Sequence, residues 1–385
     1  DECEAGGPYE MEIQCGDENI KFQDILIGEV WICSGQSNME MTMKGNMGQP
    51  IDHSLETLLN AGNYRDRIRF ITVPRTKGVK ERTDFEGAKW EVSSPETTMD
   101  CSAAGYFFAR QLTETLHLPV GLVINSWGGS RIEAWMTEET LASVEGANIE
   151  AAKNPKLDTN SRLQCLYNIM LQPVKNYTAR GFLWYQGESN LFNYQIYAPM
   201  MTAMVQLWRN VWEAPDMPFY YVQIAPHKYG NSRNINSALL QEAQMKALQT
   251  IPNSGMIPTI DVGDEFCIHP PQKNVVGLRL ANLALTKTYG IRRLPSNGPT
   301  MTKVDYADKK AIVTFDNAPA GLFPTFSELE GFEIAGADKK FYPAKAKIVG
   351  RTNTVEVWSE EVTQPVAVRY AFRNYVGNIT LRNTF

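Results

Sequence analysis

Residues 25–39 read ILIGEVWICSGQSNM, a mostly apolar run that ends at Cys33 and passes into a polar turn. The apolar run predicts a buried strand over residues 25–33. Glycine at position 35 permits the sharp turn that follows. Open α/β sheets hold their ligands at the ends of their strands, and the turn places Ser37 there. The segment therefore indicates a nucleophilic hydroxyl and makes hydrolysis the first hypothesis.

Strand and helix patterns alternate from residue 25 to about residue 290. After the first strand, we predict strands at residues 68–73, 120–126, 181–185, 219–224 and 256–261. The apolar spacing predicts helices between them, at residues 103–116, 161–175, 194–212, 237–250 and 272–289. Several strands are apolar almost throughout, which is typical of strands covered on both faces. The alternation predicts an α/β fold with a parallel sheet and helices on both sides.

The composition changes at both ends of this region. Residues 9–13 (YEMEI) alternate as a half-buried strand does, and we interpret residues 1–24 as the remnant or edge of an N-terminal β-domain. A linker-like stretch at residues 295–299 (PSNGP) precedes short alternating runs at residues 311–315, 344–348, 354–357 and 366–370. These runs predict an antiparallel β-domain over residues 293–385, which leaves residues 25–292 as the catalytic domain.

Composition excludes several classes of function. The chain has 385 residues, 43% of them hydrophobic, with 8 Trp and 16 Tyr, so it can build a large core. The net charge is −6 and no basic tract stands out, which argues against nucleic acid as a partner. No apolar run approaches the roughly 18 residues of a membrane span. The printed sequence also shows no signal-peptide pattern.

The six cysteines lie far apart and include no CxxC pair, so they give no support to a zinc site. Cys3 and Cys15 flank a possible hairpin and form the one pair considered for a disulfide. A chain of this size does not need such bonds, and we favour reduced thiols.

Four histidines are available as a catalytic base. His269 lies in residues 261–271 (DVGDEFCIHPP), after the last predicted strand and before the last helix. This position would place it at the carboxyl edge of the sheet together with Ser37, so we favour it. His227 also follows a strand and is interpreted as a substrate contact or a loop residue. His53 lies in a polar insertion, and His117 caps a helix end.

Two further strand ends offer donors for a developing oxyanion. Residues 123–130 (VINSWGGS) contain paired glycines, Gly128 and Gly129, whose backbone N–H groups can approach a ligand. Residues 182–190 (FLWYQGESN) contain the side-chain amides of Gln186 and Asn190. Each signal is weak alone. Together with the serine and histidine turns, they supply the ingredients of an ester hydrolase.

The order GQSNM, SWGG, WYQGESN and IHP resembles the SGNH (GDSL-like) hydrolases, and more narrowly the sialate O-acetylesterase family of carbohydrate esterases. The segments GEVWICSGQSNMEM and INSWGGSRIEAWM carry the resemblance, and so do GFEIAGADKKFYPAKAKI and PVAVRYAFRN in the tail. It covers essentially the whole chain. The resemblance implies a three-layer, flavodoxin-like parallel sheet with a C-terminal antiparallel β-domain.

The resemblance also implies roles for individual residues. Ser37 would be the nucleophile, and His269 the general base and then the general acid. The oxyanion hole would use the N–H groups of Ser37 and of Gly128 or Gly129. It would also use a side-chain amide, which is Asn190 by motif, with Gln186 as a rival nearer the strand end.

One position departs from the superfamily pattern, which places Asp three residues before the catalytic histidine. Here that position is Phe266. Asp264 or Glu265 would substitute if the loop bulges, or Glu188 would approach from the neighbouring turn. Alternatively, a backbone carbonyl orients the imidazole and the site is a Ser–His dyad. We favour Asp264 or a carbonyl, and the choice between triad and dyad stays open.

The implied substrate is a 9-O-acetylated sialic acid, with acetylxylan or another plant glycan as the alternative. The implied reaction needs no metal or organic cofactor. Arg131 would contact the sialate carboxylate, or else pair with Glu133 or Glu188. Further candidates for substrate binding are Gln36, Glu188 and His227, with Trp127, Trp135 and Tyr185 as possible sugar-stacking faces. A non-catalytic carbohydrate-binding protein is the less favoured reading. The resemblance implies a periplasmic or secreted location.

Overall fold

The computed structural model of the chain describes residues 4–292 and 294–384, which divide into two compact units. Within the described residues, unit 1 comprises residues 4–223, 243–256 and 269–281, and unit 2 comprises residues 224–242, 257–268, 282–292 and 294–384. The expected domain borders after residues 24 and 292 stay predictions.

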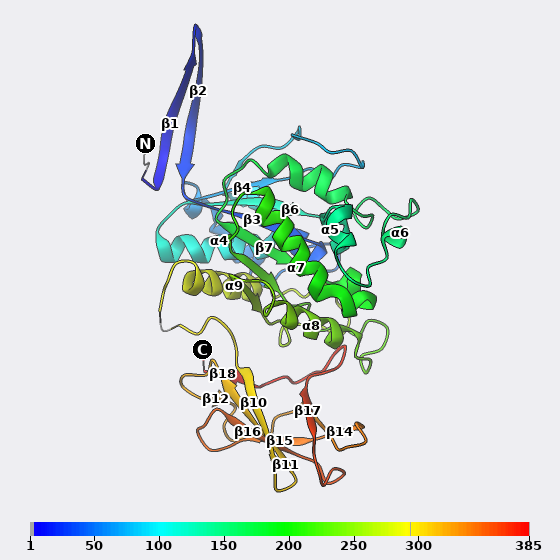
Figure 1. Cartoon of the computed structure of the whole chain (residues 1–385). Coiled ribbons are helices and arrows are strands. Elements are labelled where there is room, and N and C mark those ends of the chain that lie inside the picture. Colours follow the sequence, from blue (N-terminus) through cyan, green and yellow to red (C-terminus); the bar gives the residue numbers. More distant parts are fainter. Residues whose placement is uncertain (1–3, 293, 385) are drawn as a thin grey trace. The chain divides into compact units, whose positions relative to one another are not determined.

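A seven-stranded sheet in the order β5-β4-β6-β3-β7-β8-β9 forms the centre of the α/β region (Figure 1). Strand β3 is parallel to β6 and β7, β4 is parallel to β6, and β7 is parallel to β8, whereas β5 runs antiparallel to β4. The strands are β3 (Glu29–Gly35), β4 (Ile68–Thr72), β5 (Glu91–Val92), β6 (Val120–Ser126), β7 (Gly181–Tyr185), β8 (Phe219–Val222) and β9 (Ser254–Ile257). The prediction of a mostly parallel α/β sheet is confirmed.

The predicted strand at residues 25–33 is in fact two strands. Strand β2 (Glu18–Ile27) pairs with β1 (Gly6–Cys15) in an N-terminal hairpin, and β3 begins at Glu29. Gly28 separates them, and a Cβ on it would lie 2.1 Å from the Pro119 carbonyl oxygen. The break is set by a segment distant in sequence, so the continuous apolar run conceals it.

The long helices lie close to their predicted positions. The helices are α1 (Ser37–Glu40), α2 (Ser54–Leu59), α3 (Pro95–Thr98), α4 (Ala103–Leu116), α5 (Glu138–Ala142), α6 (Ile149–Ala152), α7 (Tyr194–Val211), α8 (Asn236–Ala247) and α9 (Lys273–Lys287). The helix predicted at residues 161–175 is shorter and irregular. Its place is taken by a π-helical turn, η3 (Tyr167–Leu171), and a 3-10 turn, η4 (Gln172–Val174), where Pro173 cannot donate a helical hydrogen bond.

Helices α4 and α7 cover opposite faces of the sheet. Phe108 of α4 meets Trp31 of β3 edge-on, with ring centroids 5.2 Å apart. Trp208 of α7 meets Trp184 of β7 at 5.5 Å. Trp184 pairs with Ser34, which is three residues after Trp31, so the two tryptophans point to opposite faces. Large buried aromatic side chains therefore fix both helices to the central strands.

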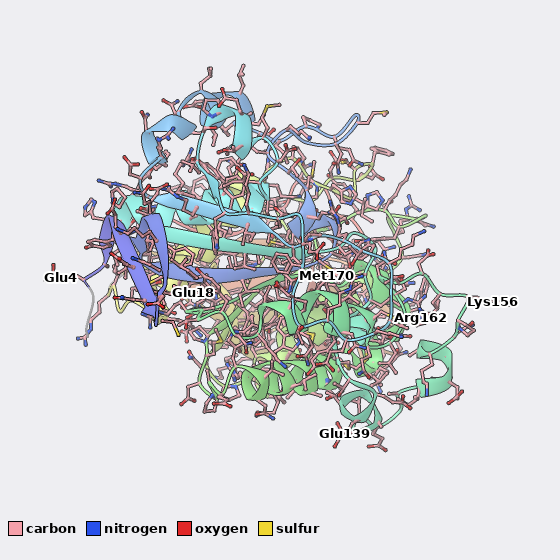
Figure 2. The ribbon with its side chains drawn as sticks, turned by 90° about the horizontal axis from the view of Figure 1, so that it is seen from above. Glu4, Glu18, Glu139, Lys156, Arg162 and Met170 are labelled. Carbon is pink, nitrogen blue, oxygen red and sulfur yellow. The ribbon has the colours of Figure 1, made fainter. Side chains whose placement is uncertain are left out.

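The chain makes a long excursion between β6 and β7. It begins with the 3-10 turn η2 (Ile132–Trp135), continues through the short helices α5 and α6, and ends with η3 and η4. In Figure 2, Glu139, Lys156 and Arg162 mark this excursion, on the side of unit 1 away from the hairpin residues Glu4 and Glu18. Among residues 4–292 and 294–384, no helix combines the length and apolar character that crossing a bilayer requires.

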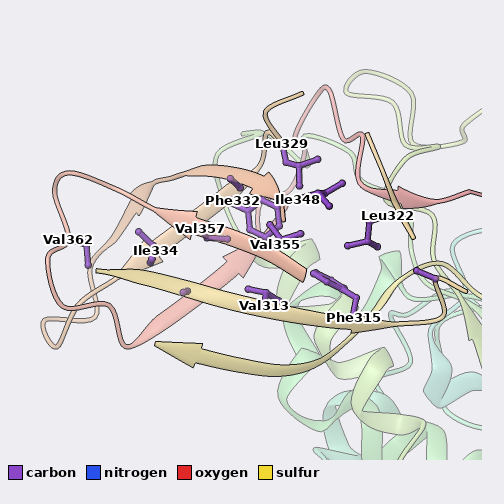
Figure 3. Packing of buried hydrophobic residues seen from close by; sticks show 13 residues of the cluster. Val313, Phe315, Leu322, Leu329, Phe332, Ile334, Ile348, Val355, Val357 and Val362 are labelled. Carbon is purple, nitrogen blue, oxygen red and sulfur yellow. The ribbon is translucent and has the colours of Figure 1, made fainter. Parts of the chain in front are cut away.

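Unit 2 contains antiparallel sheets, as predicted for the C-terminal region. One has the order β10-β11-β16-β15, one the order β14-β13-β17, and a third pairs β12 with β18. Burial alternates along β11, β15 and β16, and their inward side chains share one apolar core with Ile334 and Phe332 (Figure 3). The strands are β10 (Thr300–Ala307), β11 (Lys310–Asp316), β12 (Leu322–Phe323), β13 (Phe332–Ala335), β14 (Phe341–Pro343), β15 (Lys345–Ile348), β16 (Thr354–Trp358), β17 (Ala367–Tyr370) and β18 (Arg382–Asn383).

Gly277 lies where α9 packs against α4 and gives a test of this packing. A Cβ there would lie 2.5 Å from the Phe107 Cβ and 2.8 Å from the Ala104 carbonyl oxygen. Gly277→Ala should therefore lower the free energy of unfolding by about 1–3 kcal/mol, although alanine is the better helix former. Urea unfolding measures this. Gly62→Ala is the control, because its Cβ meets nothing within 4 Å. Equal midpoints for the two variants would contradict the prediction.

Candidate active site

Ser37 begins α1 directly beyond the end of β3. Gly35 has φ +133°, and a Cβ on it would lie 2.2 Å from the Tyr185 carbonyl oxygen, so only glycine fits. The same carbonyl accepts a hydrogen bond from the Gln36 N–H at 2.9 Å. The close approach of β3 and β7 thus fixes the turn, and the Ser37 side chain is half-buried at its end.

His269 precedes α9 and contacts Ser37, a residue 232 positions earlier. Its Nε2 atom lies 2.8 Å from the Ser37 Oγ, within hydrogen-bond distance. Its Nδ1 atom lies 2.8 Å from the Oε1 atom of Gln49. The sequence pointed to Ser37 and His269 but not to Gln49, since a single glutamine in a polar loop belongs to no recognisable motif.

Asp264 and His227 both lie in unit 2. The Asp264 Oδ1 accepts hydrogen bonds from the backbone N–H groups of Phe266 and Cys267, each at 2.8 Å. The His227 Nδ1 lies 3.2 Å from the Asp264 carbonyl oxygen. The Asp264 carboxylate therefore caps its own loop, and its expected role in orienting His269 stays a prediction.

The backbone N–H groups near Ser37 differ in their availability. The Gly128 N–H donates to the Glu40 carboxylate, which also pairs with Arg75. In the part of the chain that the structure describes, the N–H groups of Ser37 and Gly129 donate to no protein acceptor. Gly129 has φ +70°. Ser37 and Gly129 therefore hold the unused donors, and no sequence motif pointed to Glu40 or Arg75.

The amides of Gln186 and Asn190 belong to a buried network. The Gln186 Nε2 donates to the Ser130 carbonyl oxygen at 2.9 Å and to the Asn190 Oδ1 at 2.7 Å. The Asn190 Nδ2 donates to Glu133 at 2.8 Å. The Gln186 Oε1 accepts from the Tyr197 hydroxyl. These bonds use both hydrogens of the Gln186 amide, so the expected part of either amide in an oxyanion hole stays a prediction.

A buried lysine links the serine turn to the histidine loop. Lys273 is fully buried, and its Nζ donates to the Asn38 Oδ1 and to the Pro270 carbonyl oxygen, each at 2.8 Å. The Asn38 Nδ2 in turn donates to Glu188 at 2.7 Å. Burial raises the pKa of the Glu188 carboxyl, while the Asn38 hydrogen bond and the Lys273 charge oppose that rise. Glu188 is thus engaged with the residue that follows Ser37.

Two of the expected substrate-binding side chains keep free donors. The Gln36 Oε1 accepts from the backbone N–H of Gly187 at 3.1 Å, whereas its NH₂ group has no protein acceptor among residues 4–292 and 294–384. The half-buried Arg131 has no ion-pair partner within these residues either. Glu133 and Glu188 instead accept from Asn190 and Asn38.

The aromatic candidates fare differently. Trp135 and Tyr185 are 0% exposed and belong to the core, so the prediction that they offer faces to a sugar is wrong. Trp127 is half-buried.

Within the described residues, no group of three or more His, Cys, Asp or Glu side chains is placed to hold a metal ion. Cys15 is free, and Cys3 lies outside the described residues.

Curated proteins provide sequence relatives. Sialate O-acetylesterases from Pongo abelii and Homo sapiens are 30% and 29% identical to this chain, in alignments of 343 positions that cover 81% of it. The chain spans 64% of the length of each of these relatives.

A solved structure and a family description both name carbohydrate acetylesterases. A structure described as a novel carbohydrate acetylesterase from Xanthomonas citri is 32% identical, with a TM-score of 0.87, and the match covers 99% of this chain and 83% of that one. The family described as carbohydrate esterase, sialic acid-specific acetylesterase, matches residues 27–286. The match spans β3, Ser37 and His269. The chain therefore belongs to the sialic acid-specific acetylesterase family of carbohydrate esterases.

Proposed function

We propose that this protein is a serine esterase that removes O-acetyl groups from carbohydrates. The observation that carries the proposal is the 2.8 Å separation of the Ser37 Oγ and the His269 Nε2. A nucleophile and a base within hydrogen-bond distance are the minimum arrangement for acyl transfer. Family membership supports the same reaction class. An intact pair of this kind disfavours a non-catalytic carbohydrate-binding role.

The finer fold assignment that we propose is the three-layer, flavodoxin-like sheet of SGNH hydrolases, with an antiparallel β-domain after residue 292. The strand order supports it. Counted along the chain without β4 and β5, the run β6-β3-β7-β8-β9 reads 2-1-3-4-5, the flavodoxin-like order. In such sheets, ligands bind where the order reverses, which here is the end of β3 and β7.

The proposed reaction has two steps. The Ser37 Oγ attacks the acetyl carbonyl carbon while its proton passes to the His269 Nε2. The tetrahedral oxyanion collapses, the bond to the sugar oxygen breaks, and His269 returns the proton to that oxygen. Water, deprotonated by His269, then attacks the acetyl-enzyme, releasing acetate and restoring Ser37. No step requires a metal or an organic cofactor.

The oxyanion needs donors that are unused in the resting site. The N–H groups of Ser37 and Gly129 meet that condition, and Glu40 holds the N–H of Gly128. One residue before Ser37, the Gln36 NH₂ is a further donor without an acceptor among residues 4–292 and 294–384. Gln186 or Asn190 would contribute only after releasing a present acceptor.

For the substrate, we propose an O-acetylated sialic acid, with a neutral acetylated plant glycan such as acetylxylan as the alternative. The Arg131 guanidinium has no ion-pair partner among residues 4–292 and 294–384. This favours the sialate, since arginine binds carboxylates through two hydrogen bonds and neutral glycans carry no carboxylate. His227 and Glu188 remain proposed substrate contacts. A periplasmic or secreted location, where acetylated glycans occur, fits this substrate.

The nucleophile can be tested directly. Ser37→Ala should lower turnover of a chromogenic acetate ester by about 10³-fold or more, because the acyl-enzyme can no longer form. Ser34→Ala is the matched control, since it removes a fully buried hydroxyl near the end of β3 that has no hydrogen-bond partner among residues 4–292 and 294–384. Equal turnover for wild type and Ser37→Ala would remove the basis for the esterase proposal.

The substrate class is tested at Arg131. Arg131→Met should raise the KM for a 9-O-acetylated sialate by about 10–100-fold through loss of a charged hydrogen bond, and leave a neutral acetate ester unaffected. The exposed Lys156→Met in the same excursion is the control. A higher kcat/KM for acetylated xylo-oligosaccharides than for the sialate would favour the neutral glycan instead.

The buried lysine is tested by stability. Lys273→Met should lower the free energy of unfolding by about 2–4 kcal/mol, because buried acceptors and Glu188 lose their cation. Adding Glu188→Gln should recover part of the loss, since it removes the carboxylate that is left without a counter-charge. Urea unfolding of the two single variants and the double variant measures the coupling. Strictly additive losses would show that the two groups act independently.

A further inference from the structure

The two ring nitrogens of His269 have different tasks. To accept the Ser37 proton, the Nε2 atom must carry a lone pair, so in neutral imidazole the hydrogen must sit on Nδ1. Which tautomer forms depends on the group that faces Nδ1. That group includes the Oε1 atom of Gln49, 2.8 Å away, and a carbonyl-type oxygen can only accept a hydrogen bond. The contact therefore selects the tautomer that a general base requires.

The backbone holds Gln49 in place from two directions. Asn46 and Gln49 exchange backbone hydrogen bonds, each at 3.0 Å, in a tight turn. Gly45 precedes the turn with φ +74°, and a Cβ there would lie 2.5 Å from the Gln49 carbonyl oxygen. Three residues after Gln49, the Asp52 N–H donates to the Pro271 carbonyl oxygen at 3.0 Å, which ties this segment to the histidine loop. The half-buried Gln49 is thus fixed relative to His269.

We propose that Gln49 is a positioning residue for His269, which makes the site a Ser37–His269–Gln49 triad with a neutral third member. This inference rests on the proposed esterase function. Gln49 would supply the acceptor for the His269 Nδ1. The superfamily pattern assigns that task to an aspartate three residues before the histidine, where this chain has Phe266. An amide oxygen orients the ring and fixes its tautomer, but it stabilises the imidazolium of the transition state less than a carboxylate does.

The first test removes the acceptor and keeps the side-chain length. Gln49→Met should lower kcat for a chromogenic acetate ester by about 10–10³-fold, with KM nearly unchanged, because in this proposal Gln49 acts through His269 and not on the substrate. Met47→Ala is the matched control, since Met47 lies two residues away in the same turn and is fully exposed. It should keep the wild-type kcat.

The second test introduces a charge. Gln49→Glu keeps an acceptor facing Nδ1, so most of the turnover should remain. A carboxylate favours protonated His269, and only the neutral ring acts as base. The acidic limb of the kcat/KM profile against pH should therefore move to higher pH, by roughly one unit. The shift reports whether side chain 49 faces the ring in solution, since a carboxylate held away from Nδ1 would not produce it, and the readout does not depend on the stability of Gln49→Met.

The outcomes separate the two proposals. If Ser37→Ala retains wild-type turnover, the esterase proposal fails first. If turnover depends on Ser37 but Gln49→Met keeps the wild-type kcat and Gln49→Glu keeps the wild-type pH profile, the triad is overturned and the esterase stands. Asp264→Asn serves as the competing variant. A large loss of kcat in Asp264→Asn, together with unchanged kcat in Gln49→Met, assigns the orienting role to Asp264 and overturns the inference.

Discussion

The ammonium group of Lys273 has no access to solvent, and burial of such a charge is tolerated only when the interior supplies hydrogen-bond acceptors. Its acceptors are Asn38, which follows Ser37, and Pro270, which follows His269. The need to satisfy one buried cation therefore holds the Ser37 turn and the His269 loop together. Removing that cation would disturb the interior and the site at once.

The features that were predicted best are those that follow from local sequence patterns. The parallel strands were found because each is a compact apolar run, and Ser37 and His269 were found because the ends of parallel strands share one edge. The predictions failed where a distant group decides the outcome. Gly28 interrupts an apolar run because the Pro119 carbonyl occupies the space beside it. The helix expected at residues 161–175 failed for a local reason instead, because Pro173 lies within that segment and cannot donate a helical hydrogen bond.

The residues that support the site could not be predicted from the sequence, because only the fold brings them to their partners. Gln49 matters only because the fold brings His269 to it across 220 positions, and Glu40 only because the Gly128 N–H lies opposite. Conversely, Gln186 and Asn190 have amide donors in a suitable motif, yet both amides already donate hydrogen bonds to neighbouring residues. Residue type and spacing identify which groups are capable of a task, whereas the surrounding partners decide which of them are free for it.

The separation in sequence of the proposed catalytic contacts has a consequence for how the protein would gain activity. Ser37 and Gln49 meet His269 across 232 and 220 residues, and β3 pairs with β6 and β7 rather than with its sequence neighbour β2. Contacts of this length require closure of large loops and form slowly during folding. Helical content can therefore return well before the chain hydrolyses anything. Recovered turnover would report completed assembly of unit 1, which a spectroscopic signal of secondary structure cannot do.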